Sequence, residues 1–350
     1  MRSYAVLDSL MGTVPGPLVT RLATVDAGRG SEALYTHQLP GLLGDLAELA
    51  RVESVVASSA IEGVLVEPGR AERIVRGADQ RLRARSEQEL AGYRDALDYL
   101  FMDDPGELNV GLILHLHRLL FGRTGGDGGH LKTVDNLVVD RRPDGTTTVR
   151  FTPVSHVDTP FHLTELTDRG RLAAAAGLHH RVLLAGLFAL DFLTIHPFVD
   201  GNGRLSRLLS TYQLVQAGYG VGRYVSLERL VYDRRDEYYD ALGASTGGWH
   251  QSAHDPWPWL SFFVDILASA YEDFATRAAE HRSGVTKQER VRNFVLNHAG
   301  GSFEIADIRR AVPGVSDPTL RLVLRELKDG GLVVPSGVGR GTRWTRTAPR

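Results

Sequence analysis

The chain has 350 residues, of which 43% are hydrophobic and 23% are charged, and its formal net charge at pH 7 is −2. This length and apolar content suffice for two or three domains with cores of their own. The sequence contains no cysteine, which excludes a disulfide framework, a thiolate zinc site and a thiol nucleophile.

The N-terminal segment MRSYAVLDSLMGTVPGPLV has one Arg and no long apolar run before Gly12 and Pro15, so it is not typical of a secretory signal peptide. The longest apolar stretches elsewhere are too short to span a bilayer. We therefore expect a cytoplasmic protein that does not contact a membrane.

A helical pattern, LLGDLAELARVESVVA, is followed by SSAIEG, from Ser58 to Gly63. Taken alone, a serine four residues before a glutamate and then a glycine is also an ordinary helix end, with Gly63 as the C-terminal cap. A functional interpretation of this segment depends on a second motif, described below.

In the middle of the chain, ELNVGLILHLHRLLFG predicts a helix from Glu107 to Gly122. His115 and His117 lie two positions apart and so on different faces of this helix, which argues against a metal pair and favours structural roles. Alternating β-branched residues around a Pro-Asp-Gly turn then predict a β-hairpin from Thr133 to Phe151.

The most informative segment is HPFVDGNGRLSR, from His196 to Arg207. The apolar RVLLAGLFALDFLTI before it predicts a buried helix, and RLSRLLSTYQLVQAG predicts a second helix that starts at Arg204 and stops at Gly218. The motif is therefore a short loop that enters a helix.

This arrangement predicts an anion site. Gly201, Asn202 and Gly203 fall where the first backbone N–H groups of a helix lack partners and the helix dipole is positive, and glycines let a phosphate approach the backbone. Arg204 and Arg207 are three positions apart, so both can lean toward the same ligand.

The same loop contains groups for chemistry. His196 can act as a base near neutral pH, and Asp200 is a hard oxygen ligand suited to Mg²⁺ on a polyphosphate. Each residue alone also has an ordinary structural interpretation, as a turn residue or part of a solvated helix face. Their combination in this order favours a phosphate-binding site that also catalyses a reaction.

HPFVDGNGRLSR resembles, at every defining position, the HxFx(D/E)GNGRxxR motif of Fic-domain proteins, most of which transfer AMP from ATP to a protein hydroxyl. The resemblance implies that His196 deprotonates the target Ser, Thr or Tyr hydroxyl and that Asp200 holds Mg²⁺. It assigns the remaining motif positions as follows: Phe198 anchors the loop in the core, Gly201 to Gly203 cradle the phosphates, Asn202 contacts the phosphate chain, Arg204 the β-phosphate and Arg207 the γ-phosphate.

SSAIEG resembles the (S/T)xxxE(G/N) inhibitory motif of the same family, with Ser58, Glu62 and Gly63 at the matching positions. The resemblance implies that Glu62 pairs with Arg207 and so keeps the γ-phosphate out of its productive pose. Its place ahead of the catalytic motif matches the class of Fic proteins that contain their own inhibitory helix.

Two further segments resemble parts of the same family. The hairpin resembles the Fic flap, which adds a strand to the backbone of a target protein and aligns its hydroxyl. DEYYDAL, from Asp236 to Leu242, resembles the segment that packs on adenine, with Tyr238 and Tyr239 as candidates, although core aromatics are an equally good interpretation. The asparagine that often follows in the family is replaced here by ASTGGWHQ, so this side of the pocket stays undefined.

After the amphipathic PWLSFFVDILASAYEDFATRAAEH, the polar segment from His281 to Arg290 predicts a linker. Three short helical patterns follow: VRNFVLNHAG, FEIADIRRAVP and SDPTLRLVLRELKDGGLVV. Ser316 is the expected N-cap of the third, with a proline in its first turn. A hairpin wing around Gly337–Thr342 completes a resemblance to a winged-helix domain.

Charge is segregated toward this C-terminal region. Residues 284–350 contain 12 Lys+Arg and 6 Asp+Glu, a net charge of +6, which leaves −8 for the remainder of a chain whose total is −2. Thr319, Arg321 and Arg325 on the third helix are placed to meet DNA phosphates and bases. Winged helices also serve as protein-interaction modules, and the sequence leaves both partners open.

The sequence thus predicts a mostly α-helical Fic fold with a flap at about 131–153 and a C-terminal winged helix. The expected regions are 1–100 with the inhibitory motif, 101–280 as the catalytic core, and 285–350. The predicted function is adenylylation of a target protein and of the chain itself, with ATP as co-substrate and Mg²⁺ as cofactor, held off by Glu62.

Two alternatives remain open. One is a DNA-binding regulator whose Fic core senses nucleotide, and the other is a transferase of another nucleotide or of phosphocholine. The sequence does not define the target protein, the base preference, removal of AMP or homo-oligomerisation.

Overall fold

The computed structural model describes most of the chain, namely residues 2–38, 40–78, 81–102, 105–126, 128–141, 147–282, 286–299, 301–312, 314–337 and 342–347. It forms two compact units, one of residues 1–32 and 50–272 and the other of residues 33–49 and 273–350. These units divide the chain differently from the three regions expected from the sequence, because most of the N-terminal region folds together with the central one.

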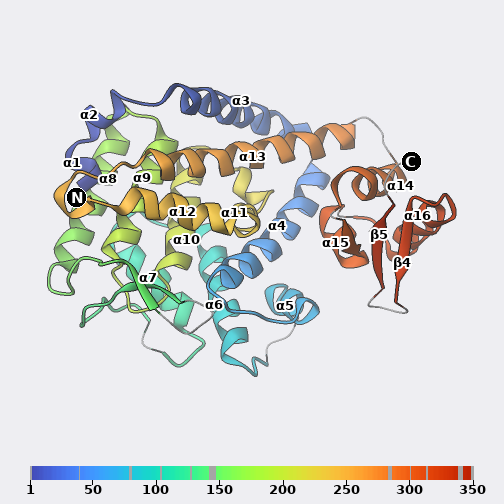
Figure 1. Cartoon of the computed structure of the whole chain (residues 1–350), viewed down its shortest axis with the longest axis horizontal. Helices are drawn as coiled ribbons and strands as arrows, with labels where there is room; N and C mark the ends of the chain where they lie inside the picture. Colours follow the sequence, from blue (N-terminus) through green and yellow to red (C-terminus); the bar gives the residue numbers. More distant parts are fainter. Residues whose placement is uncertain are drawn as a thin grey trace. The chain divides into compact units, whose positions relative to one another are not determined.

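The predicted mostly α-helical fold is confirmed (Figure 1). Up to residue 282 the helices are α1 (Arg2–Ala5), α2 (Leu7–Met11), α3 (Gly16–Gln38), α4 (Pro40–Ile61), α5 (Pro68–Val75), α6 (Arg85–Leu100), α7 (Val110–Phe121), α8 (Thr159–Ala176), α9 (Arg181–Ile195), α10 (Asn202–Gln216), α11 (Leu227–Asp233), α12 (Arg235–Thr246) and α13 (Trp257–Arg282). Short 3₁₀ turns lie at Val221–Arg223 and Trp249–Gln251. No helix among the described residues is long and apolar enough to cross a membrane.

Helix α9 is the central element of the larger unit. Every residue from Val182 to Ile195 except Leu193 is buried, as expected for a helix that is apolar on all sides. Helices α8 and α10 both pack against it, and α6 contacts α7 and α10. The loop between α9 and α10 is therefore held from several sides.

The predicted hairpin is present but starts later than expected. Strand β1 (Val138–Arg141) pairs antiparallel with β2 (Thr147–Phe151), with a bulge between Val138 and Val139. The residues from 131 to 137 are not a strand, because side chains among them form hydrogen bonds with neighbouring loops, as described below. The Pro-Asp-Gly turn at 143–145 lies outside the described residues.

In the smaller unit, the described residues from 286 onward form three helices and a three-stranded sheet: α14 (Lys287–Asn293) with a π-helical turn at Phe294–His298, α15 (Ile305–Ala311), α16 (Asp317–Asp329), β3 (Ser302–Glu304), β4 (Val333–Ser336) and β5 (Arg343–Arg346). The strands are antiparallel in the order β3-β5-β4. Its core is an aliphatic cluster with Phe303 inside and Trp344 packed against it.

One prediction for this unit was wrong. The pattern FEIADIRRAVP predicts a helix from its first residue, but Phe303 and Glu304 belong to β3, where Phe303 pairs with Trp344 and alternates with its neighbours in burial. Ser316 is the N-cap residue of α16 with a proline in the first turn, as predicted, although its hydroxyl lies 3.0 Å from the Thr319 hydroxyl and makes no capping hydrogen bond. The tip of the predicted wing, residues 338–341, lies outside the described residues.

Candidate active site

The motif loop, residues 196–201, begins where α9 ends. His196 has a left-handed backbone (φ 51°), which is uncommon for a residue with a side chain, and its N–H donates to the Phe192 carbonyl at 3.0 Å. Gly201 at the other end has φ 82°, and a Cβ there would lie 2.8 Å from the Phe121 ring. The loop therefore requires glycine at 201 and holds His196 in a strained conformation.

Phe198 and Asn202 close this loop. The Phe198 side chain is fully buried, as predicted, and stacks on His117 with ring centroids 3.8 Å apart. The Phe198 N–H donates to Asn202 Oδ1 at 3.0 Å, and Asn202 Nδ2 donates back to the Phe198 carbonyl at 2.8 Å. Both ends of the Asn202 carboxamide are thus used within the loop, whereas the resemblance implied a contact with the phosphate chain.

His117 supports the loop from α7. Its Nε2 lies 3.1 Å from the Asp200 carbonyl oxygen and its Nδ1 accepts from the Gly129 N–H at 2.8 Å. Burial lowers the pKa of His117 to about 4, so the ring is neutral and Nε2 is the donor. His117 therefore has a structural role, as expected, and this role is to support the motif loop.

Lys132 and Asn136 connect the motif loop to the base of the hairpin. Lys132 is buried, and its ammonium donates to the carbonyls of Val154 at 2.6 Å and Ile195 at 3.3 Å and to Asn136 Oδ1 at 2.8 Å. Its backbone N–H donates to the Pro197 carbonyl at 2.9 Å, and Asn136 Nδ2 donates to the Phe198 carbonyl at 3.0 Å. These contacts fix the residues on both sides of His196.

His196 is arranged as a neutral base. Its Nδ1 lies 3.2 Å from the Leu193 carbonyl oxygen, and because a carbonyl only accepts, Nδ1 carries the proton and Nε2 keeps its lone pair. Burial lowers the pKa of His196 to about 4. The imidazole is therefore neutral at neutral pH, and its Nε2 is able to accept a proton.

His196 lines a cavity of about 420 Å³, within the size range of small-molecule sites. One wall comes from the hairpin and another from α12. The lining residues are Glu62, Val138, Val139, Arg150, Phe151, Leu193, His196, Gly203, Tyr238, Tyr239, Leu242, Gly243 and Thr246.

The two predicted tyrosines both line this cavity, in different environments. Tyr238 is buried and packs against the rings of Trp259 and Phe262, so it is also a core aromatic. Tyr239 is partly exposed, and the Arg150 guanidinium lies 4.9 Å from the centre of its ring. Arg150 comes from β2, so the tyrosine ring and the hairpin meet at the cavity.

Glu62 of the SSAIEG segment and Arg207 meet in the structure, although they are 145 positions apart. Arg207 Nη2 donates to Glu62 Oε1 at 2.9 Å and to the Ser58 carbonyl at 2.9 Å, and Arg207 Nε donates to Ser58 Oγ at 2.9 Å. The guanidinium is buried, and Nη1 has no hydrogen-bond partner among the described residues. Gly63 follows with φ 76° after α4 ends at Ile61.

The Glu62 carboxylate also covers the start of α10. A Cβ at Gly203 would lie 2.2 Å from Glu62 Oε1, so the carboxylate rests against the first turn of this helix. This is the position at which the sequence predicts an anion. Glu62 therefore occupies the predicted phosphate site with a negative charge of its own.

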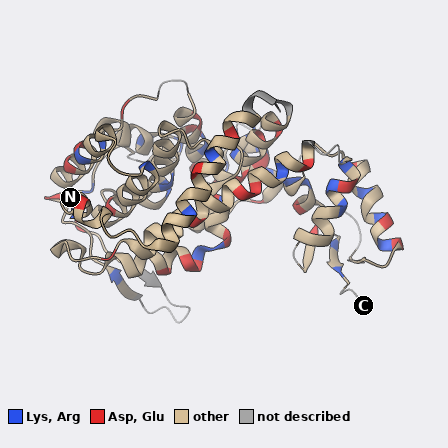
Figure 2. Cartoon of the chain, turned by 90° about the horizontal axis from the view of Figure 1, so that it is seen from above, with Lys and Arg blue, Asp and Glu red and all other residues tan. Residues whose placement is uncertain are grey.

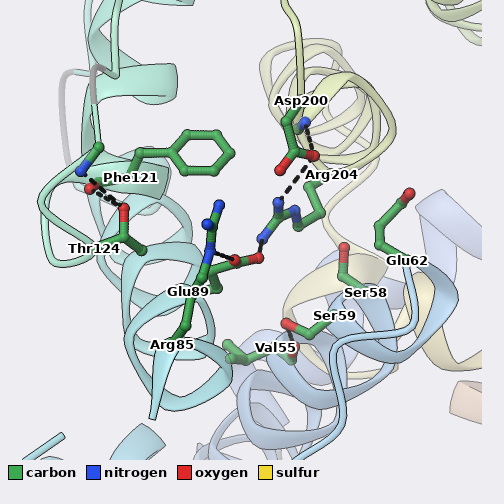
Figure 3. A network of polar contacts seen from close by, with 12 residues as sticks. Val55, Ser58, Ser59, Glu62, Arg85, Glu89, Phe121, Thr124, Asp200 and Arg204 are labelled. Carbon is green, nitrogen blue, oxygen red and sulfur yellow. Dashed lines mark hydrogen bonds and ion pairs between the residues drawn. The ribbon is translucent and has the colours of Figure 1, made fainter.

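Arg204 has different partners from Arg207. Its Nη1 donates to Glu89 Oε2 at 2.8 Å, and its Nη2 lies 3.5 Å from Asp200 Oδ1, which also accepts from the Gly201 N–H at 2.6 Å. Arg85 donates through Nε to the other oxygen of Glu89 at 2.8 Å. Figure 3 shows Arg85 and Arg204 on either side of the Glu89 carboxylate, with Asp200 beyond Arg204.

Residues 107–214 match the Fic/DOC family. The chain therefore carries a Fic/DOC domain. The matched segment begins just before α7, includes the hairpin and the whole of the 196–207 motif, and ends in α10.

Curated relatives of the Fic/DOC domain are distant. The protein adenylyltransferase Fic of Aedes aegypti is 33% identical over 116 residues, 33% of this chain and 21% of that protein. The protein of the same name from Drosophila melanogaster is 26% identical over 250 residues, 70% of this chain and 46% of its own length. The chain thus spans between about a fifth and a half of the length of these relatives.

A solved structure supports the fold over almost the whole chain. A Fic family protein from Desulfovibrio desulfuricans G20 has a TM-score of 0.64 and 21% identity, and the likeness covers 97% of this chain and 98% of that one. At this identity the likeness concerns the fold. It extends beyond the Fic/DOC domain into the regions before and after it.

Several residues of the site were not found from the sequence. Glu89, Arg85, Lys132 and Asn136 lie outside the 196–207 motif, and no short pattern marks them. Lys132 and Glu89 are buried charged residues, a property that becomes visible only when the partners that neutralise them are known.

Proposed function

We propose that the chain is a protein adenylyltransferase that transfers AMP from ATP to a Ser, Thr or Tyr hydroxyl of a target protein and of itself. The observation that carries this proposal is the neutral His196, with the Nε2 lone pair available, on the wall of a cavity next to the start of α10. A base and an anion site side by side are what attack of a hydroxyl on a phosphate requires.

In the proposed reaction, His196 Nε2 takes the proton of the target hydroxyl as its oxygen attacks the α-phosphorus. The new oxygen–phosphorus bond forms while the bond to the bridging oxygen of the β-phosphate breaks, and pyrophosphate leaves. The N–H groups at the start of α10 and the guanidiniums of Arg204 and Arg207 stabilise the charge on the phosphate oxygens. The hairpin offers its backbone to the target as a strand partner, and Tyr238 and Tyr239 line the proposed adenine side.

The residues present fit a magnesium ion at Asp200. The Asp200 side chain is exposed, and its Oδ2 has no hydrogen bond to the described residues, so this oxygen is available as a metal ligand. When bound, Mg²⁺ would supply positive charge to the phosphate oxygens. Asp200 would hold it next to the buried Arg204.

We further propose that Glu62 keeps the enzyme inactive. The carboxylate pairs with Arg207 and lies against Gly203, so it takes both the guanidinium and the helix start that a γ-phosphate would use. Ser58 holds Arg207 in this position through two hydrogen bonds. Release of Glu62 would open this site to the triphosphate.

The test is incubation of the Glu62→Gly variant with ATP, GTP, UTP, CTP or CDP-choline, followed by mass spectrometry of its peptides. Addition of AMP from ATP, absent in the Glu62→Gly/His196→Ala double variant, is the expected result. Preferential addition of another nucleotide or of phosphocholine would establish the alternative transferase. A protein that binds ATP and modifies no hydroxyl would favour the alternative of a nucleotide-sensing regulator.

A second candidate function, DNA binding, concerns the smaller unit. Helix α16 exposes Arg321, Leu322 and Arg325 around a shallow hollow. Arg321 and Arg325 have no ion pair with the described residues, whereas Arg309 pairs with Asp317 at 2.8 Å. Lys and Arg recur along the helices of this unit among acidic residues (Figure 2).

We propose that this face of α16 contacts DNA phosphates. Gel shifts of the full chain on random duplex over a salt series test the proposal. The double variant Arg321→Ala/Arg325→Ala should bind less tightly and lower the salt slope by about two. Binding that is equal in wild type and variant, or absent in both, would favour a protein partner for this unit.

A further inference from the structure

The buried carboxylate of Glu89 receives two guanidiniums of different character. Arg204 reaches it from α10 and is buried, with a side chain only 2% exposed. Arg85 reaches it from the first turn of α6, four residues before Glu89, and its side chain is 73% exposed. Glu89 therefore has a buried charged partner in Arg204, and Arg85 adds a second, exposed one.

The outer half of the Arg85 guanidinium is available for a ligand. Its Nε atom is hydrogen-bonded to Glu89, while Nη1 and Nη2 have no hydrogen bond within the part of the chain that the structure describes. The Glu89 hydrogen bond first, and the charge of Asp200 in addition, raise the pKa of Arg85. The same Glu89 carboxylate binds Arg204 of α10, which places Arg85 beside the first turns of that helix.

The charges of the site favour a contact between Arg85 and a phosphate. Arg85 and Arg204 are balanced by Glu89 and Asp200, so these four groups have no net charge. The triphosphate of ATP brings about four negative charges. If Asp200 is occupied by Mg²⁺, as proposed above, only Glu89 offsets the charges of Arg85 and Arg204.

We propose that Arg85 is a further nucleotide-binding residue, whose guanidinium contacts the β- and γ-phosphates of ATP and the pyrophosphate that leaves. This inference rests on the proposed function, because the order of the phosphates follows from a reaction at His196. Arg85 and Arg204 approach the Glu89 carboxylate from different sides, and Arg204 also contacts Asp200 (Figure 3). A planar guanidinium suits two phosphate oxygens at once.

The alternative is that Arg85 and Glu89 form an ordinary i,i+4 surface pair. Such a pair contributes little to stability and nothing to ligand affinity. Arg169 provides the matched control, since it donates through Nε to Glu165 at 2.8 Å with the same spacing on α8, and neither residue belongs to the network of Glu89, Arg204 and Asp200.

The experiment is calorimetric titration of the full chain with ATP, pyrophosphate and AMP in the presence of Mg²⁺. The Glu62→Gly protein is the parent, and Arg85→Ala, Arg85→Lys and Arg169→Ala are added to it. Arg85→Ala should weaken ATP and pyrophosphate binding about tenfold and leave AMP affinity unchanged, because AMP has no β-phosphate. Arg85→Lys should recover part of the loss, and Arg169→Ala should match the parent.

Equal ATP affinity in the parent and the Arg85→Ala protein would overturn the inference, and so would an equal loss of AMP affinity, which indicates a distorted pocket. A parent that binds no ATP would overturn the proposed function. Pyrophosphate would then still decide whether Arg85 contributes to an anion site.

Discussion

Glycine at position 62 removes the carboxylate that the structure places 2.9 Å from Arg207. The guanidinium keeps its two hydrogen bonds to Ser58, so its position should change little. The turn of α10 at Gly203 loses the negative group that covers it. We therefore expect the triphosphate to bind with its γ-phosphate on Arg207.

The size of the effect follows from the strength of the lost contact. A hydrogen bond between charged groups contributes roughly 1.5–3 kcal/mol. Because the Glu62 side chain is 32% exposed, solvent screening favours the lower end of this energy range. Since about 1.4 kcal/mol corresponds to a factor of ten in an equilibrium constant, we expect the affinity for the triphosphate to rise about tenfold. Correct alignment of the α-phosphorus adds a rate factor on the order of 10².

The assay is self-modification with α-labelled ATP, run beside thermal melts. The Glu62→Gly protein should incorporate label about 100-fold faster than wild type, and the Glu62→Gly/Arg207→Ala protein should lose most of that gain. Glu72→Gln, which removes the charge from an exposed pair with Arg76, is the control and should behave as wild type.

The melts separate inhibition from simple damage. Without nucleotide, Glu62→Gly should melt at a lower temperature, since the buried Arg207 has lost its charged partner. Mg-ATP should raise its melting temperature more than that of wild type, because the γ-phosphate replaces the carboxylate. A variant that folds normally and incorporates no more label than wild type would refute the autoinhibition argument.

Three further predictions concern the base, the loop support and the hairpin. Because the pKa of His196 is lowered to about 4, its base form is present above that pH, so kcat/KM should stay flat from pH 8 to about 5; an acid limb near 6.5 would contradict this assignment. Lys132→Met leaves buried carbonyls without a donor, so urea denaturation should show a free energy of unfolding lower by about 1–3 kcal/mol, and the transfer rate should fall more than the ATP affinity. A stability equal to that of the wild type would refute the bridging role. Val138→Pro removes a backbone donor of β1 and should reduce modification of a target more than ATP binding; an unchanged target rate would exclude the hairpin from the mechanism.

The parts of the site that could be predicted are those encoded in short, continuous patterns. The motif from His196 to Arg207 specifies a helix end, a glycine loop and a helix start within twelve residues, and the structure places them in that order. SSAIEG was recognisable through its resemblance, and the structure brings Glu62 to Arg207.

The missed residues depend on tertiary contacts. Arg85 and Glu89 form an i,i+4 pair that has no distinguishing feature in the sequence. Its significance depends on Arg204, which lies more than a hundred positions later and binds the same carboxylate. Lys132 precedes the predicted hairpin and was given no role, yet its ammonium donates to the carbonyls of Val154 and Ile195 from two other segments. Asn202 was expected to face a ligand, and its carboxamide instead satisfies the backbone of Phe198.

The chain's secondary structure shows the same limit. Helices α7 and α9 were predictable because their apolar residues recur with a helical period or fill every position. Strand β3 was not, because three residues beside a helical pattern are too few for alternation to be read, and its pairing partner Trp344 lies about 40 positions away.

The most direct test of the central claim compares the position of the label in ATP. The Glu62→Gly protein is incubated with Mg²⁺ and with ATP labelled on either the α- or the γ-phosphate, beside the Glu62→Gly/His196→Ala protein. AMP transfer predicts covalent label from α-labelled ATP alone, and none in the protein that lacks His196. Label from the γ-phosphate, or α-label that persists without His196, would contradict it.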